Sequence, residues 1–326
     1  MNRSRRERAD QGEAGEMAGG TGRRGRSACQ TRPVDWSTGY REYAAPAALA
    51  HALACVWVSV IPAAGTPPTR VLPDACTDLI WRGGNGVSLA GPDTGPVLAP
   101  SPPGSVIAGV RFRPGAGGPA LGLPLSALRD QHLDPAGLRT GLPGGRGADL
   151  SRRVHGGLPP GEAVHRLVRL AGEMVAAGPP DPLVTAAARQ LGRSGAREGT
   201  AFQGSTGVQG STGVQISTGV QISSVARDLG ISERQLHRRC VAAVGYGPVL
   251  LRRVLRFRRV VSRIDADGAL DDLASLAAAA GYADQAHLTR ESRELAGLPP
   301  AALARERRGR IPAVPPPPTS EESRWS

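Results

Sequence analysis

The chain has 326 residues and carries 40 Lys and Arg residues against 28 Asp and Glu residues, which gives a formal net charge of +12. At roughly 150 residues per domain, this length predicts about two domains, and the positive charge favours a polyanion such as nucleic acid as a partner. No apolar run in the sequence approaches the ~20 residues of a membrane span, and the N-terminus does not have the pattern of a secretory signal. The four cysteines do not have the spacing of a zinc finger. We therefore expect a cytoplasmic protein without membrane association or bound metal.

The N-terminal half is predicted to be β-rich. Residues 1–32 are rich in Arg, Gly and Glu without apolar periodicity, which is typical of a disordered leader. Over residues 33–141, short apolar runs alternate with Pro and Gly, as in a small domain of strands and turns. We expect a short helix over Ala44–Ala54 and a hairpin loop over Arg82–Gly86. Strands are expected over four runs: Cys55–Ile61, Thr77–Trp81, Val87–Ala90 and Val106–Phe112.

Helical periodicity follows. Residues 142–180 are predicted to be a linker and then a connecting helix, and Asp181 is the expected N-cap of the next helix, Leu183–Leu191. Three tandem hexapeptides come next. We interpret 194–221 as a flexible loop insertion, because three copies without a regular apolar ladder cannot build the core of a β-solenoid. The Pro-rich residues 307–326 are predicted to be a disordered tail.

A helix-turn-helix pattern then occurs twice. The first copy has a short helix over Ser223–Leu229, a turn at Gly230 and a second helix that begins at Glu233. Ser232 and Gln235 form an S-x-x-Q capping box at the start of that second helix. In DNA-binding proteins with this motif, the second helix enters the major groove with its N-terminal residues against the bases. The pattern therefore favours DNA among the polyanions.

The second copy repeats these signals further along the chain. Leu273–Ala280 is predicted to be helical, Gly281 marks the turn, and Asp284 is the expected N-cap of the helix Gln285–Glu294. In both copies a small residue lies four positions before the turn glycine, which lets two helices cross closely. Two such units in one chain make coincidence improbable.

The helix that joins the two copies has an apolar and a basic stripe. Steps of four and three residues predict a buried stripe of Leu250, Val254, Phe257, Val261 and Ile264. A different face carries Arg252, Arg256, Arg259 and Arg263. These arginines are either phosphate contacts or a solvated face, and the sequence leaves both interpretations open.

Residues 181–306 resemble the C-terminal domain of AraC/XylS-type transcription regulators. The matching segments are GISERQLHRR (230–239), GYGP (245–248), RFRR (256–259), AGYADQAHLTR (280–290) and AGLPP (296–300). The resemblance implies seven helices, in which two helix-turn-helix units joined by a long helix read adjacent major grooves. It also implies double-stranded DNA and RNA polymerase as partners. Cys240 and Ser292 stand where the family usually has Phe.

By position, the resemblance places candidate DNA contacts on both second helices. The candidates are Ser232, Arg234, Gln235, His237, Arg238 and Arg239 in the first unit, and Gln285, His287, Thr289, Arg290 and Arg293 in the second. Arg pairs with guanine O6 and N7, and Gln with adenine N6 and N7, so these residue types fit base recognition. Arg239 and Arg293 fit phosphate contacts as well, and His287 also fits packing against the core.

Segments of the N-terminal half resemble a β-rich domain often found ahead of this C-terminal domain in bacterial regulators. They are RVLPDACTDLIW (70–81), VSLAGP (87–92) and GVRFRPG (109–115). In them, Trp would supply stacking and Arg would supply a partner for an anionic group of a small-molecule effector. The candidate pocket residues are Asp74, Asp78, Trp81, Arg111 and Arg113, with turn-capping Asp and edge-strand Arg as the alternative interpretation.

We therefore expect an α+β protein, with a small β-rich N-terminal domain and an all-α C-terminal domain, that regulates transcription by binding DNA. No nucleophile–base pair or clustered metal ligands support an enzyme, and no cofactor is expected. The N-terminal domain is expected to sense an effector or to mediate a homodimer. The alternatives are a catalytic or a protein-interaction domain that the C-terminal domain tethers to DNA.

Overall fold

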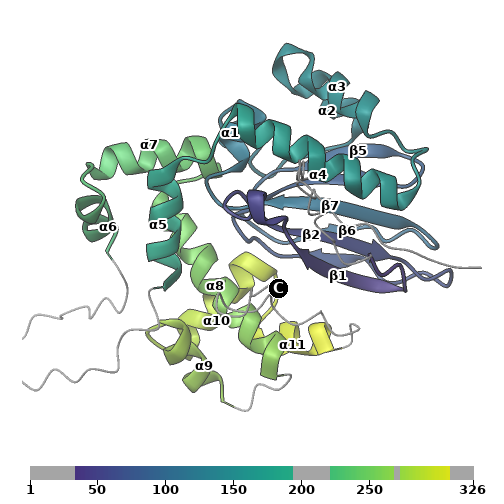
Figure 1. Ribbon diagram of the computed structural model, residues 1–326. Coiled ribbons are helices and arrows are strands. Elements are labelled where there is room, and N and C mark those ends of the chain that lie inside the picture. Colours follow the sequence, from purple (N-terminus) through teal and green to yellow (C-terminus); the bar gives the residue numbers. More distant parts are fainter. Residues whose placement is uncertain (1–33, 194–220, 268–271, 309–326) are drawn as a thin grey trace, which may run out of the picture. The chain divides into compact units, whose positions relative to one another are not determined.

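The structure is a computed structural model that describes residues 34–193, 221–267 and 272–308. The predicted leader, nearly all of the predicted loop insertion and most of the predicted tail therefore lie outside the described residues. The residues before about 134 form β-sheets with short helices, and the residues from 182 onward form helices (Figure 1). This is the α+β class expected from the sequence.

A six-stranded antiparallel sheet has the strand order β1-β2-β7-β4-β5-β8. A separate two-stranded sheet pairs β3 (Thr69–Val71) with β6 (Val97–Ala99). Strands β2, β4, β5 and β7 occupy the four predicted runs to within two residues, and the predicted hairpin joins β4 to β5. The strands of the main sheet are β1 (Gly39–Ala44), β2 (Leu53–Val60), β4 (Thr77–Arg82), β5 (Gly86–Ala90), β7 (Val106–Phe112) and β8 (His132–Leu133).

Two predictions for this half are wrong. Ala44–Ala54 holds the end of β1, the single 3-10 turn Ala47–Leu49 and the start of β2 instead of a helix. The predicted linker contains α3 (Arg146–Arg153), which packs against α2 (Pro135–Gly141). Leu138 and Leu150 are buried in these helices, so their apolar contacts outweigh the helix-breaking glycines of the segment. The remaining short elements are α1 (Gly117–Leu121) and 3-10 turns at Leu125–Ala127 and Pro143–Gly145.

The main sheet is covered by a helix and also carries a small apolar cluster. Helix α4 (Pro160–Ala177) lies across the sheet and contacts β7 and β4 (Figure 1). The strand register places Trp57, Gly109 and Ile80 side by side on one face, and Trp57 and Ile80 belong to the small cluster. A Cβ atom added at Gly109 would lie 2.4 Å from Cε2 of Trp57. The missing side chain at Gly109 is therefore what gives the indole its space.

Seven helices form the described part of the chain after residue 181, as the resemblance implies. Every one of them contributes apolar side chains to a single core cluster. The long helix α8 contacts α5, α7, α9, α10 and α11, and it is the element around which the others are arranged. The seven helices are α5 (Pro182–Arg193), α6 (Ile222–Asp228), α7 (Glu233–Val244), α8 (Pro248–Asp267), α9 (Leu273–Ala280), α10 (Gln285–Ala296) and α11 (Pro300–Arg308).

The buried stripe of α8 is wider than the predicted one and extends beyond it on both sides. Val254, Phe257 and Ile264 are buried as predicted, whereas Leu250 and Val261 are only partly buried. Their neighbours Leu251 and Val260 are fully buried instead. The cause is that helices pack on several sides of α8, so that its core-facing surface exceeds a single heptad-like row.

We predict that Gly109→Ala destabilises the protein by about 1–3 kcal/mol, because the new methyl group overlaps the Trp57 indole and the sheet must rearrange. Urea unfolding measures the change in free energy. Gly192→Ala in α5 is the matched control, because an added Cβ there meets nothing within 4 Å and glycine is a poor helix former. Equal stability of the two variants would contradict the packing of Trp57 described here.

Candidate nucleic-acid interface

The first helix-turn-helix unit consists of α6 and α7. Gly230 in the turn has a φ of 66°, a left-handed conformation that favours glycine. The backbone N–H of Gln235 donates to Ser232 Oγ at 3.2 Å, and the backbone N–H of Ser232 donates to Gln235 Oε1 at 2.9 Å. The predicted capping box is therefore confirmed. Leu236 is fully buried, which fixes the face that α7 turns toward the core.

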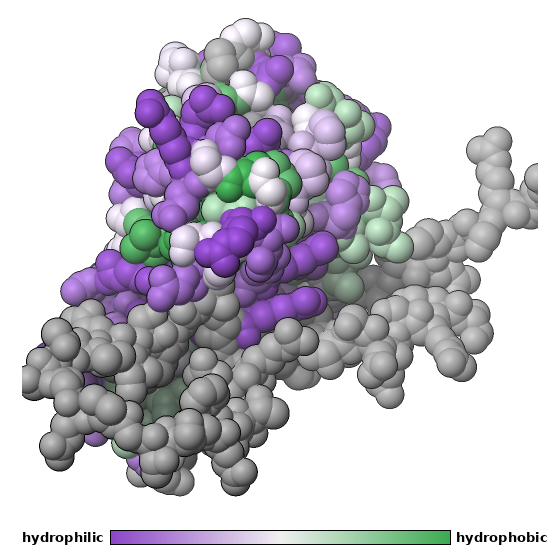
Figure 2. Space-filling view, turned by 90° about the vertical axis from the view of Figure 1, so that its left-hand side faces the viewer, coloured by the Kyte–Doolittle hydropathy of each residue, from purple (hydrophilic) through white to green (hydrophobic). Residues whose placement is uncertain are grey.

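Polar side chains cover the outer face of α7. Arg234, His237 and Arg238 are exposed, together with Ser232 and Gln235 of the capping box. The side-chain oxygen Oε1 of Gln235 is used by the capping box. The side-chain NH2 group of Gln235 is therefore the part that can donate a hydrogen bond to a bound ligand. The face of the molecule that carries α6 and α7, on the left of Figure 1, is mostly hydrophilic (Figure 2).

Arg239 forms an ion pair with another residue of the chain. Its Nη1 donates to Asp181 Oδ2 at 2.8 Å. Asp181 caps the N-terminus of α5 as predicted, because its other carboxylate oxygen accepts the backbone N–H of Leu183 at 2.9 Å. Arg238 and Arg239 also border a surface hollow, whose other lining includes Gly118, Pro119, Gly122, Leu123 and Pro124.

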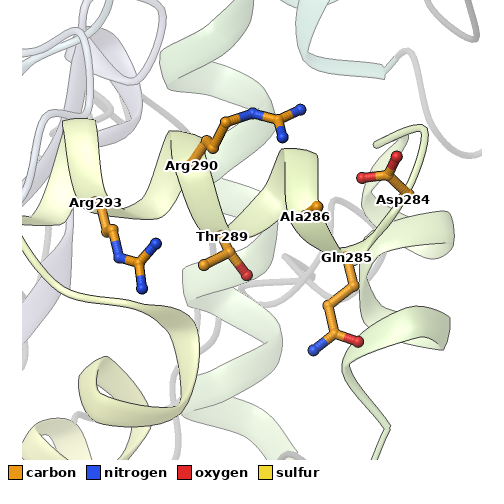
Figure 3. Close-up of a pocket in the computed structure, with 6 residues that line it drawn as sticks. All are labelled: Asp284, Gln285, Ala286, Thr289, Arg290 and Arg293. Carbon is orange, nitrogen blue, oxygen red and sulfur yellow. The ribbon is translucent and has the colours of Figure 1, made fainter.

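The second unit consists of α9 and α10, and it presents most of its candidate residues around one surface hollow. Asp284 caps α10 as predicted, because its Oδ1 accepts the backbone N–H of His287 at 2.6 Å. In Figure 3, Gln285, Thr289 and Arg293 extend from the same side of α10, and Arg290 extends from another side. The hollow is lined by Asp284, Gln285, Ala286, Thr289, Arg290 and Arg293.

His287 packs inside the second unit and is only partly exposed. Its ring meets the edge of Tyr282, with 5.2 Å between ring centroids, and its Nε2 lies 3.3 Å from Arg256 Nη2. Burial and then the positive charge of Arg256 lower the pKa of His287 below its ordinary value. The structure thus places this candidate against Tyr282 and Arg256, as in the packing interpretation.

A buried carboxylate that the sequence did not predict connects α10 to α8. Glu291 is 3% exposed, and its Oε2 accepts from Arg256 Nη2 at 2.6 Å and from Arg253 Nε at 3.0 Å. Its Oε1 accepts the hydroxyl of Tyr282 at 2.8 Å. Burial alone would raise the pKa of Glu291, but these hydrogen bonds and the charge of Arg256 lower it. In the sequence, Glu291 lies three residues after the inward-facing Leu288, and this spacing places both residues on the same face of the helix.

Two arginines of the predicted basic stripe on α8 bind the ends of neighbouring helices. Arg259 donates to the carbonyl of Ala280 at 2.9 Å and to that of Gly192 at 3.1 Å, at the C-terminal ends of α9 and α5. Arg256 donates to the carbonyl of Gly281 at 3.4 Å, at the end of α9, stacks on the Tyr282 ring with 4.2 Å to the ring centroid, and pairs with a carboxylate of α10. Cations at helix C-termini satisfy carbonyls that lack a partner within the helix. Arg256 and Arg259 therefore fit neither of the two interpretations that the sequence left open, a phosphate contact or a solvated face.

The candidate effector residues separate into two groups. Arg111 Nε donates to Asp78 Oδ1 at 3.0 Å, its Nη2 donates to Asp78 Oδ2 at 3.0 Å, and Asp74 lies 3.5 Å away. Trp81 is buried on the opposite face of β4 from Asp78, because side chains alternate along a strand, and it donates to a backbone carbonyl. Arg113 donates to two other backbone carbonyls. The structure therefore brings together only Asp74, Asp78 and Arg111.

Within the described residues, no group of three or more His, Cys, Asp or Glu side chains could hold a metal ion. In that same part of the chain, none of the helices has both the length and the apolar character that crossing a bilayer requires.

We predict that His287 makes the protein less stable as the pH falls through about 6.5, the ordinary histidine value. The unfolded chain binds a proton there, whereas the lowered pKa keeps the folded protein unprotonated until a lower pH, so protonation favours unfolding. Urea unfolding at pH 7.5 and 5.5 should show a smaller loss for His287→Gln than for the wild type. Identical losses would contradict the lowered pKa.

Two family models match separate parts of the chain. Residues 41–134 match a domain of unknown function (DUF6597), and residues 225–306 match a helix-turn-helix domain. No curated protein matches the sequence. Among solved structures, the chain is similar to the apo form of a ToxT variant from Vibrio cholerae strain SCE256, with 10% identity and a TM-score of 0.40 over 77% of this chain and 96% of that one. It is also similar to ToxT from Vibrio cholerae O395, with 8% identity and a TM-score of 0.37 over 76% and 95%.

The helix-turn-helix match extends from α6 to α11 and so includes both units described above. It bears out the resemblance of this region to the C-terminal domain of AraC/XylS-type regulators. The chain therefore carries a helix-turn-helix domain over residues 225–306, preceded by a β-rich domain, and this helix-turn-helix domain resembles that of AraC-type regulators.

Proposed function

We propose that the protein is a sequence-specific transcription regulator whose recognition helices α7 and α10 read two neighbouring major-groove segments of one DNA duplex. The observation that carries the proposal is that both helices have a capped N-terminus beside exposed Arg and Gln side chains. The 20-residue helix α8 joins the two units. At 1.5 Å per residue it spans about 30 Å, close to the ~34 Å of one DNA turn.

The exposed side chains divide into base readers and phosphate contacts. Arg238 and Arg290 occupy the same place in the two helices, six residues after the N-cap, and are proposed to pair with guanine. Gln285 is proposed to pair with adenine, and the methyl group of Thr289 to contact a thymine methyl. Arg234, His237, Arg293 and the cap residues Ser232 and Gln235 complete the proposed contact set.

The β-rich domain is proposed to control DNA binding without catalysing a reaction. Binding of a small-molecule effector or formation of a homodimer is the proposed means. The DNA-bound protein is proposed to alter recruitment of RNA polymerase, a partner that the resemblance implies. No cofactor enters this proposal. A thermal-shift screen of the full chain against cellular metabolites tests effector binding, because a ligand raises the unfolding temperature only by binding the folded state.

We predict that Arg238→Ala and Arg290→Ala each weaken binding to the selected DNA site by about 1–3 kcal/mol, because each removes a bidentate contact to a base. Binding to non-specific DNA should change much less. The site is first obtained by selection from a random-sequence library, and affinities are then measured by fluorescence anisotropy at one fixed salt concentration.

Arg169→Ala is the matched control, since it removes the same charge from α4, where the side chain is 64% exposed. It should leave both affinities nearly unchanged. An equal loss on specific and non-specific DNA would assign Arg238 or Arg290 to phosphate contact. A wild-type protein that enriches no DNA motif would overturn the proposed function.

A further inference from the structure

The two recognition helices carry an ion pair at the same place, with opposite polarity. The N-caps are Ser232 in α7 and Asp284 in α10. Seven residues after the N-cap stand Arg239 in α7 and Glu291 in α10, each the neighbour of a proposed base reader. Each of these side chains pairs with a different helix, α5 in the first unit and α8 in the second.

In the second unit the pair is buried and has several partners. Glu291 receives hydrogen bonds from Arg253 and Arg256 of α8 and from Tyr282 of the turn, so both of its oxygens have partners. Arg256 in turn stacks on Tyr282 and donates weakly to the Gly281 carbonyl. The carboxylate therefore fixes α10 to α8 and to its own turn at once.

In the first unit the pair is simpler and more exposed. The side chain of Arg239 is 44% exposed, and that of Asp181 is 16% exposed. Asp181 is held in place because its Oδ1 accepts the backbone N–H groups of Leu183 and Val184 at the start of α5. A guanidinium on α7 is thus anchored to a carboxylate that cannot move without uncapping α5.

We propose that Arg239 and Glu291 are positioning residues that set the rotation of α7 and α10 about their own axes. The inference rests on the proposed function. A helix with its side chains has a radius of about 5–6 Å, so a rotation of ~15° moves a surface group by about 1.5 Å. Such a shift breaks the 2.7–3.2 Å hydrogen bonds of a base reader such as Arg238 or Arg290. Each ion pair therefore affects base discrimination indirectly, because it holds the neighbouring base reader, Arg238 or Arg290, in position.

The test is base-by-base DNA selection by the full chain and its variants. Asp181→Asn retains an N-cap residue but loses the charge, and Arg239→Gln removes the other partner. Each is expected to lower discrimination by about tenfold in the half of the site that α7 reads, and the double variant to lower it no further. The half that α10 reads should be unchanged.

Glu291→Gln is expected to show the reverse pattern, with discrimination lost only in the half that α10 reads. Tyr282→Phe removes a single hydrogen bond of the same network and keeps the effect measurable if Glu291→Gln fails to fold. Asp149→Asn with Arg152→Gln is the control, because it removes an exposed ion pair of α3 and should change neither half.

Three results would overturn the inference. If Arg239→Gln weakens binding to all sequences equally and lowers the salt slope by about one, while Asp181→Asn does not, Arg239 is a phosphate contact. If the variants enrich the wild-type motif with unchanged discrimination, the ion pairs are only structural. If the wild type enriches no motif, the proposed function itself fails, which distinguishes that outcome from the other two.

Discussion

The proposed DNA-reading surface depends on the burial of α8. Its apolar side chains are enclosed by five other helices, which include both recognition helices. Protein cores are close-packed, so a helix surrounded in this way cannot shift against one unit without disturbing the other. The distance between α7 and α10 is therefore a property of the core, and a flexible connection between the two units would not provide it.

Some arginines of the helical part bind other groups of the protein, and others are exposed and proposed to contact DNA. The net charge of the chain does not distinguish these two sets. All basic residues of the sequence are Arg, whose planar fork binds carboxylates and carbonyls well. Arg256 and Arg259 donate to carbonyls at helix ends. Arg253, Arg256 and Arg239 pair with carboxylates. The 40 basic residues therefore include arginines that bind other parts of the protein and are not available to a polyanion. In the sequence, the basic stripe of α8 fits either a phosphate-binding face or a solvated face, because spacing cannot reveal the carbonyls and the carboxylate that Arg256 and Arg259 bind.

Local signals in the sequence were sufficient for strands β2, β4, β5 and β7, for the turn glycines and for the helix caps, but not for β1, β3, β6 and β8. Ser232, Asp284 and Asp181 cap the predicted helices because capping depends on residues only two or three positions apart. The network of Glu291 could not be predicted in the same way. It joins residues of α8, a turn and α10, and its partners are known only once the helices are packed. The helix α3 was missed for a related reason, because its stability comes from contact with α2.

The β-rich domain shows how packing changes the chemistry that a residue type suggests. In the sequence, Arg111 is a candidate partner for an anionic group of an effector. In the structure it is surrounded by Asp78, Asp74 and Glu42, at 3.0, 3.5 and 3.3 Å from its guanidinium. The guanidinium of Arg111 is therefore already paired with carboxylates of the protein and is not free to pair with an anion. Arg111 therefore acts as the centre of a structural ion cluster, and an anionic effector would have to be recognised elsewhere in the domain.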